Sequence, residues 1–112
     1  MREKAFINHT NNGFVLNLLN GIRISTLFGY SNYCENYDWG KEALFINRFD
    51  RIPEGSSTCE IMVKCPDQKW LDKFNRKYGD GDIVIGHSTI DEWLKILDVC
   101  RKWKPKKYKK YE

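Results

Sequence analysis

The sequence predicts an α+β domain in which a twisted, mainly antiparallel sheet packs against one long C-terminal helix. Three features indicate this fold. Asn20 and Gly21 separate two apolar segments, residues 58–65 alternate between apolar and polar side chains, and residues 88–103 have the pattern of a capped amphipathic helix. One helix cannot bury its apolar stripe alone, so the stripe requires the apolar face of a sheet.

The Asn-Gly pair predicts a β-hairpin near the start of the chain. Residues 14–19 and 22–28 flank Asn20 and Gly21 and supply the two strands. Asn-Gly favours a type I′ turn, because both central residues of that turn take positive φ. Residues 4–8 add either a short first strand or a loose lead-in.

The second half predicts two more strands and leaves one segment ambiguous. In "TCEIMVKC", residues 58–65, every second side chain is apolar, which is typical of a half-buried strand. "IVIGH", residues 83–87, predicts a further strand. "KWLDKFNRKY", residues 69–78, is compatible with a strand or a helix.

The C-terminal helix is the element that the sequence marks most clearly. Ser88 or Thr89 can cap its start, with Asp91 or Glu92 as the return partner of a capping box. Pro105 ends the helix or stands just past its end. Its apolar stripe is expected to contain Ile90, Trp93, Leu94, Leu97 and Cys100, extended by Ile96 and Trp103.

The chain of 112 residues predicts one domain, residues 1–103, followed by a basic tail, residues 104–112. The net charge is +4, but residues 101–112 hold seven cations and one acid, 7 − 1 = +6, which leaves 4 − 6 = −2 for the first hundred residues. No apolar run is long enough to span a bilayer, and no signal-like segment follows the N-terminus. We therefore expect a cytoplasmic protein without membrane contact.

No catalytic motif can be recognised, so we expect no catalytic residues, no cofactor and no metal. "HST" at His87 is one half of the paired motif of two-histidine phosphoesterases, but His9 lacks a hydroxyl residue two places on. The cysteines contain no CxxC pair, which disfavours zinc, and we expect small buried thiols rather than disulfides at Cys34, Cys59, Cys65 and Cys100.

Residues 28–39 are rich in aromatic and amide side chains. Aromatic faces stack on planar rings, and amides both donate and accept hydrogen bonds, which together favour a nucleobase-like ligand. Packing of the loop onto the sheet, or a dimer interface, is the alternative interpretation. Arginines would supply charge for phosphates. The candidate ligand-binding residues are Arg23, Phe28, Tyr30, Asn32, Tyr33, Asn36 and Arg48.

Three segments together resemble small accessory proteins of bacteriophages. They are "NGIRISTLFGYSNYCENY" at residues 20–37, "TCEIMVKC" at 58–65 and "STIDEWLKIL" at 88–97. The family that they resemble is the phage Thoeris anti-defence sponges, which sequester the cyclic ADP-ribose signals of bacterial TIR-domain proteins. Residues 41–56 and the lysine tail depart from that pattern.

The resemblance implies a protein that binds a host immune nucleotide, a cyclic ADP-ribose isomer or a cyclic oligonucleotide, without cleaving it in the infected bacterial host. Such a pocket is readily built between subunits, so we also expect a homo-oligomer. An anti-CRISPR-like inhibitor of a host nuclease complex and a small RNA-binding accessory protein are the alternatives. In both of them the basic tail would contact nucleic acid.

Overall fold

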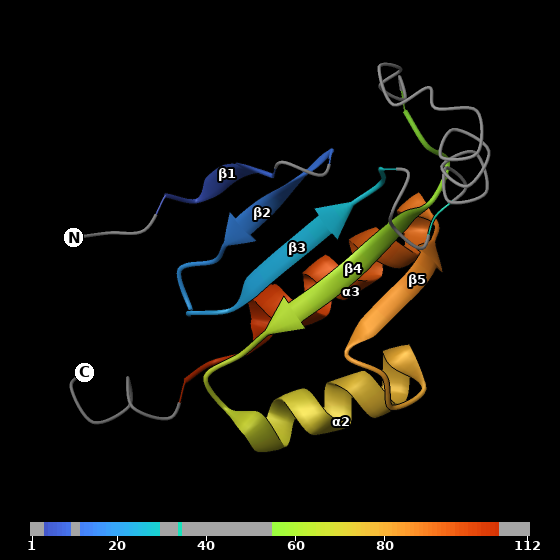
Figure 1. The fold of residues 1–112 in the computed structure, drawn as a ribbon. Coiled ribbons are helices and arrows are strands. Elements are labelled where there is room, and N and C mark those ends of the chain that lie inside the picture. Colours follow the sequence, from blue (N-terminus) through green and yellow to red (C-terminus); the bar gives the residue numbers. More distant parts are fainter. Residues whose placement is uncertain (1–3, 10–11, 30–33, 35–54, 106–112) are drawn as a thin grey trace.

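The computed structural model describes residues 4–9, 12–29, 34 and 55–105. They form one sheet of five strands that follow one another in sequence order, and each neighbouring pair is antiparallel (Figure 1). The strands are β1 (Phe6–His9), β2 (Gly13–Asn17), β3 (Arg23–Leu27), β4 (Cys59–Lys64) and β5 (Val84–Ser88).

Two helices cover the sheet. Helix α2 (Gln68–Gly79) connects β4 to β5, and α3 (Ile90–Lys102) follows β5 and crosses behind the strands (Figure 1). The antiparallel α+β arrangement is confirmed. The single long helix is not, because α3 has 13 residues and α2, with 12, shares in the core. The ambiguous segment 69–78 is thus a helix, and its start is capped by the Asp67 side chain, which accepts from two backbone N–H groups.

The core lies between the helices and one face of the sheet. Ile24 and Ile61 of the central strands are fully buried, and they belong to one cluster with Phe74 of α2 and Ile96 and Cys100 of α3. The alternation predicted for residues 58–65 is confirmed at its centre. At its start it is interrupted by a shift in register between Cys59 and Ile61.

The hairpin between β2 and β3 is confirmed, but its predicted type I′ turn is wrong. Leu18 N–H donates to the Ile22 carbonyl (2.8 Å) and Gly21 N–H to the Leu18 carbonyl (3.0 Å), which leaves a three-residue loop. Gly21 has φ of 99°, whereas Asn20 is not among the residues with positive φ. A single positive φ at the last loop position is the geometry of a three-residue hairpin loop rather than a two-residue one.

The Asn20 side chain makes hydrogen bonds to α3 that the sequence did not predict. Its side-chain amide donates to the carbonyl oxygens of Cys100 and Trp103, each at 2.8 Å, and its side-chain oxygen accepts from Ile22 N–H at 3.0 Å. The last carbonyls of a helix have no partner within the helix. The hairpin loop therefore closes the end of α3 and joins the two elements.

The capping box of α3 is confirmed, and five of the seven residues expected in its apolar stripe lie in or against the core: Trp93, Ile96, Leu97, Cys100 and Trp103. Thr89 caps the helix with Glu92 as its partner. Ile96 and Cys100 are buried, whereas Ile90 and Leu94 are 64% and 50% exposed. The C-terminal end of α3 lies near the start of α2. Trp70 of α2 lies 6.2 Å from Trp103, measured between ring centroids.

Candidate functional site

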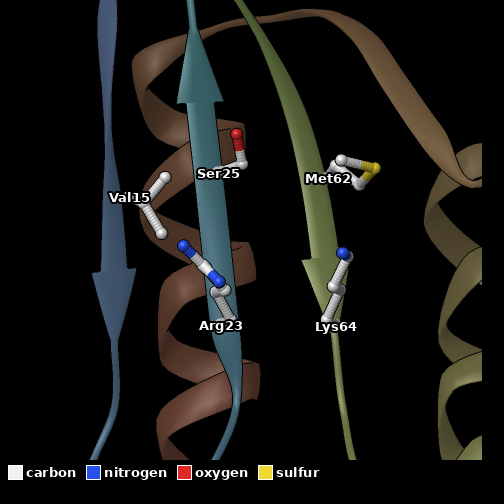
Figure 2. Close-up of a pocket in the computed structure, with 5 residues that line it drawn as sticks. All are labelled: Val15, Arg23, Ser25, Met62 and Lys64. Carbon is white, nitrogen blue, oxygen red and sulfur yellow. The ribbon is translucent and has the colours of Figure 1, made fainter. Parts of the chain in front are cut away.

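The sheet face opposite the helices carries the candidate site. Side chains along a strand alternate between the two faces. Ile24 enters the core, so its neighbours Arg23 and Ser25 point away from α3. Val15 and Met62 are the cross-strand partners of Ser25, and Lys64 is the partner of Arg23. Figure 2 shows these five side chains on β2, β3 and β4, with α3 on the far side of the strands.

Arg23 and Lys64 place two positive charges side by side. They are direct cross-strand partners in the register of β3 and β4, and both residues are exposed. Directly opposed residues have Cβ atoms about 4.5–5.5 Å apart, and like charges at that spacing repel. The ion pairs found between described residues join Arg101 and Lys102 to Asp98 on α3, and neither Arg23 nor Lys64 takes part in them.

Two shallow hollows flank the charge pair. One, of about 210 Å³, is lined by Val15, Arg23, Ser25, Met62 and Lys64. The other, of about 310 Å³, lies towards the hairpin loop and the start of α2, and its lining includes Asn17, Gly21, Cys65 and Pro66. Arg23 and Lys64 line both. A group bound between these two cations would therefore have open space on either side.

The structure separates the predicted ligand residues that it describes. Arg23 begins β3, and Phe28 follows directly after the end of that strand, half-buried, with its N–H donating to the Asn12 carbonyl at 3.0 Å. Five residue steps along a strand span about 17 Å. The two side chains thus belong to opposite ends of β3. The other candidates, Tyr30, Asn32, Tyr33, Asn36 and Arg48, lie outside the described residues.

Lys64, Ser25 and Met62 were missing from the predicted site. The alternation of residues 58–65 already placed Met62 and Lys64 on the polar face of their strand. What the sequence lacked was the register, which brings Lys64 opposite Arg23 across more than forty residues of chain. Only cross-strand pairing between these two segments could have revealed the paired charge.

Two of the described thiols are held in the neutral form. Burial raises the pKa of Cys59 to about 11, with smaller contributions from Cys34 and Glu92, and burial raises the pKa of Cys100 to about 12. A thiol is nucleophilic as the thiolate, so neither group is activated near neutral pH. No three His, Cys, Asp or Glu side chains of the described part gather in a way that could hold a metal ion.

No family model, curated protein or solved structure matches this chain. In the described part, neither helix has the length and apolar character needed to cross a membrane. The case for a function therefore depends on the geometry of the open sheet face.

Proposed function

We propose that this chain is a non-enzymatic protein that binds a phosphate-bearing nucleotide on the open face of its sheet. We further propose that it sequesters a host immune signal, a cyclic ADP-ribose isomer or a cyclic oligonucleotide, in the cytoplasm of an infected bacterial host. The observation that carries the proposal is the Arg23–Lys64 pair, two directly opposed cations that take no part in the ion pairs found between described residues.

An anionic ligand explains why such a pair is tolerated. Opposed like charges destabilise a sheet, so the arrangement costs folding free energy unless an anion binds between them. A phosphate has several acceptor oxygens. The planar guanidinium of Arg23 can bind two of them, and the ammonium group of Lys64 adds a point charge. Phosphate binding would thus turn a repulsive contact into an attractive one.

The hollows on either side would hold the uncharged parts of a nucleotide. The smaller hollow presents the Ser25 hydroxyl beside the apolar side chains of Val15 and Met62, a mixture that fits a ribose or the edge of a base. Sequestration at micromolar signal concentrations needs about −8 kcal/mol. Hydrogen bonds to charged groups contribute about 1.5–3 kcal/mol each, so the pair supplies only part of this affinity. Contacts with the other side chains that line the two hollows must supply the rest.

The RNA-binding alternative has less support on this face. Single-stranded nucleic acid is usually held by aromatic side chains on which successive bases stack. On the described strands, residues facing away from α3 include Val15, Ser25, Met62 and Val84, and no Phe, Tyr or Trp is among them. The face therefore fits one small phosphorylated ligand better than a run of bases.

Calorimetry with a panel of cyclic ADP-ribose isomers, cyclic oligonucleotides and linear oligoribonucleotides tests the proposal. We expect one small nucleotide to bind with sub-micromolar affinity, and Arg23→Gln or Lys64→Gln to weaken it at least about tenfold. Lys73→Gln is the matched control, because it removes one exposed charge from α2. Intact ligand recovered after heat denaturation distinguishes capture from cleavage.

Two results would refute the proposal. One is the absence of binding across the whole panel by folded protein. The other is an equal loss of affinity in all three variants, which would show that net charge matters and the pair does not. Preference for long oligoribonucleotides would favour RNA binding instead. Failure of every nucleotide would favour the protein-inhibitor hypothesis.

A further inference from the structure

Strand β1 forms one edge of the sheet, and no other described strand pairs with its outer side. Its sequence, Phe6–His9, contains neither lysine nor proline, the residues that proteins commonly place on edge strands to prevent pairing. Phe6 is 79% exposed, which makes it one of the most exposed large apolar side chains of the described residues. Nothing in the sequence of this strand therefore opposes the addition of another strand.

The hydrogen-bond pattern shows which backbone groups of β1 point outwards. Asn17 N–H donates to the Ala5 carbonyl at 2.8 Å, so Ala5 and Asn17 form a hydrogen-bonded pair. Bonding to one neighbouring strand alternates along an antiparallel ladder. Ile7 is therefore also bonded to β2, whereas Phe6 and Asn8 direct their N–H and C=O groups to the free edge.

The opposite edge of the sheet differs. The register between β4 and β5 shifts between Cys59 and Ile61, and His87 within β5 has φ of 50°, in the left-handed region. Bulges and irregular backbone are devices that keep an edge from pairing. The β5 edge is thus interrupted, whereas the ladder between β1 and β2 is regular over all four of its residue pairs.

We propose that the β1 edge binds a second copy of this chain, with the two β1 strands antiparallel about a twofold axis at Ile7. Phe6 then pairs with the partner's Asn8, and Asn8 pairs with the partner's Phe6. Both pairs consist of residues whose backbone groups point outwards, so four N–H···O=C hydrogen bonds form without any change of register. The five-stranded sheets of the two copies then form one continuous sheet.

The side chains agree with this pairing. Ile7 meets the partner's Ile7 at a position without backbone hydrogen bonds, where opposed side chains lie closest. Ile7 is also the cross-strand partner of Val15, so the contact extends an apolar row of the sheet. Phe6 gains a neighbouring strand on its exposed side. The same residues of each copy make the contact, as a twofold interface requires.

Sedimentation equilibrium of the full chain tests the proposal over about 1 μM to 1 mM, because a contact this small implies a dissociation constant in the micromolar range. We expect the mass to rise towards twice 13.3 kDa. Asn8→Pro should lower the measured mass to that of one folded chain. Proline removes the outward N–H of residue 8, which the fold itself does not use. Asn8→Ala keeps this N–H and should still dimerise.

A second variant and a residue-level measurement cover the case in which Asn8→Pro fails to fold. Phe6→Lys replaces an exposed apolar side chain and places the two lysines diagonally across the twofold axis, about 7–8 Å apart. It also puts on β1 the residue type that keeps edge strands from pairing, so it should weaken dimerisation at least about tenfold. Amide exchange should slow at Phe6 and Asn8 as protein concentration rises, and stay constant at Ile7. A monomer at every concentration, or an unchanged dimer in Phe6→Lys, overturns the proposal. The test needs no nucleotide, so its outcome is independent of the proposed ligand.

Discussion

The two faces of the sheet are built from alternate residues of the same strands, yet β3 and β4 present different side chains on them. On the face towards the helices, Ile24 and Ile61 are fully buried. On the other face, the neighbouring residues Arg23 and Met62 line hollows open to solvent. One residue along a strand thus separates a position that holds the fold together from a position that can contact a ligand.

The difference shows how a small domain can tolerate an unfavourable feature. Folding free energies of single domains are about 5–15 kcal/mol, so a repulsive cation pair is acceptable only where the rest of the structure compensates. The helix face provides that compensation through an aliphatic core and through an aromatic column in which the Trp70 and Phe74 centroids lie 5.2 Å apart. The open face can then carry Arg23 opposite Lys64.

The largest expected effect contrasts two adjacent residues of β3. Ile24→Ala should lower the free energy of unfolding by about 2–5 kcal/mol, because it leaves a cavity among fully buried neighbours. Ser25→Ala, on the opposite face, should change it by less than about 0.5 kcal/mol. Urea unfolding of both variants measures the contrast. Similar losses at the two positions would mean that the faces are not as different as the structure shows.

The next effect concerns the junction of the hairpin loop with α3. Asn20→Ala should destabilise by about 1–3 kcal/mol, because the Trp103 carbonyl and the Ile22 N–H lose their side-chain partner and the Cys100 carbonyl keeps only the Trp103 N–H, at 3.3 Å. Asn17→Ala is the control, since its side chain makes one exposed hydrogen bond to the Lys4 carbonyl. Urea unfolding and amide exchange in the last turn of α3 report the change. Equal stability of the two variants would contradict the role of Asn20.

Alkaline pH should weaken the helix face through its buried thiol. The pKa of Cys100 rises from an ordinary 9.0 to about 12 in the folded chain, so the folded state holds this proton more tightly than the unfolded state does. The stabilisation is complete below pH 9 and is lost as pH rises towards 12, by at most about 1.4 kcal/mol per pH unit. Cys100→Ala should remove this part of the pH dependence of the free energy of unfolding. Parallel pH profiles of unfolding free energy in variant and wild type would show that the thiol does not contribute.

The sequence predicted the elements that local chemistry specifies. The capping box at Thr89 and Glu92 needs only residues three positions apart, and the alternation around Ile61 and Val63 needs only residues two apart. The sequence also contains the signals of helix α2. Asp67 is a capping residue, and the apolar side chains that follow it have helical spacing: Trp70, Leu71, Phe74 and Tyr78.

The features that escaped prediction depend on contacts between distant segments. The Asn20 side chain bonds to α3 some eighty residues away, and that contact accompanies a loop different from the one that Asn-Gly favours on its own. The candidate site depends on the register that places Lys64 opposite Arg23. None of these can be derived from periodicity within one segment.

The smallest expected effect is a gain in stability, in contrast to the losses predicted above, and it tests the open face directly. Arg23→Gln or Lys64→Gln should raise the free energy of unfolding by about 0.2–1 kcal/mol, because each change removes the repulsion between directly opposed cations. The gain should shrink at high salt, since exposed charges are screened. Lys73→Gln alters net charge equally and should give no comparable gain. Urea unfolding at low and high ionic strength measures all three variants.

The same variants connect stability to binding. If the cation pair is kept for a ligand, the changes that stabilise the unliganded fold must also weaken nucleotide binding, because both effects have the same electrostatic origin. The double variant, Arg23→Gln with Lys64→Gln, should gain less stability than the sum of the single changes, since either one already abolishes the repulsion. Strictly additive gains would show that the two charges act independently. The pair would then no longer be a reason to place a phosphate between β3 and β4.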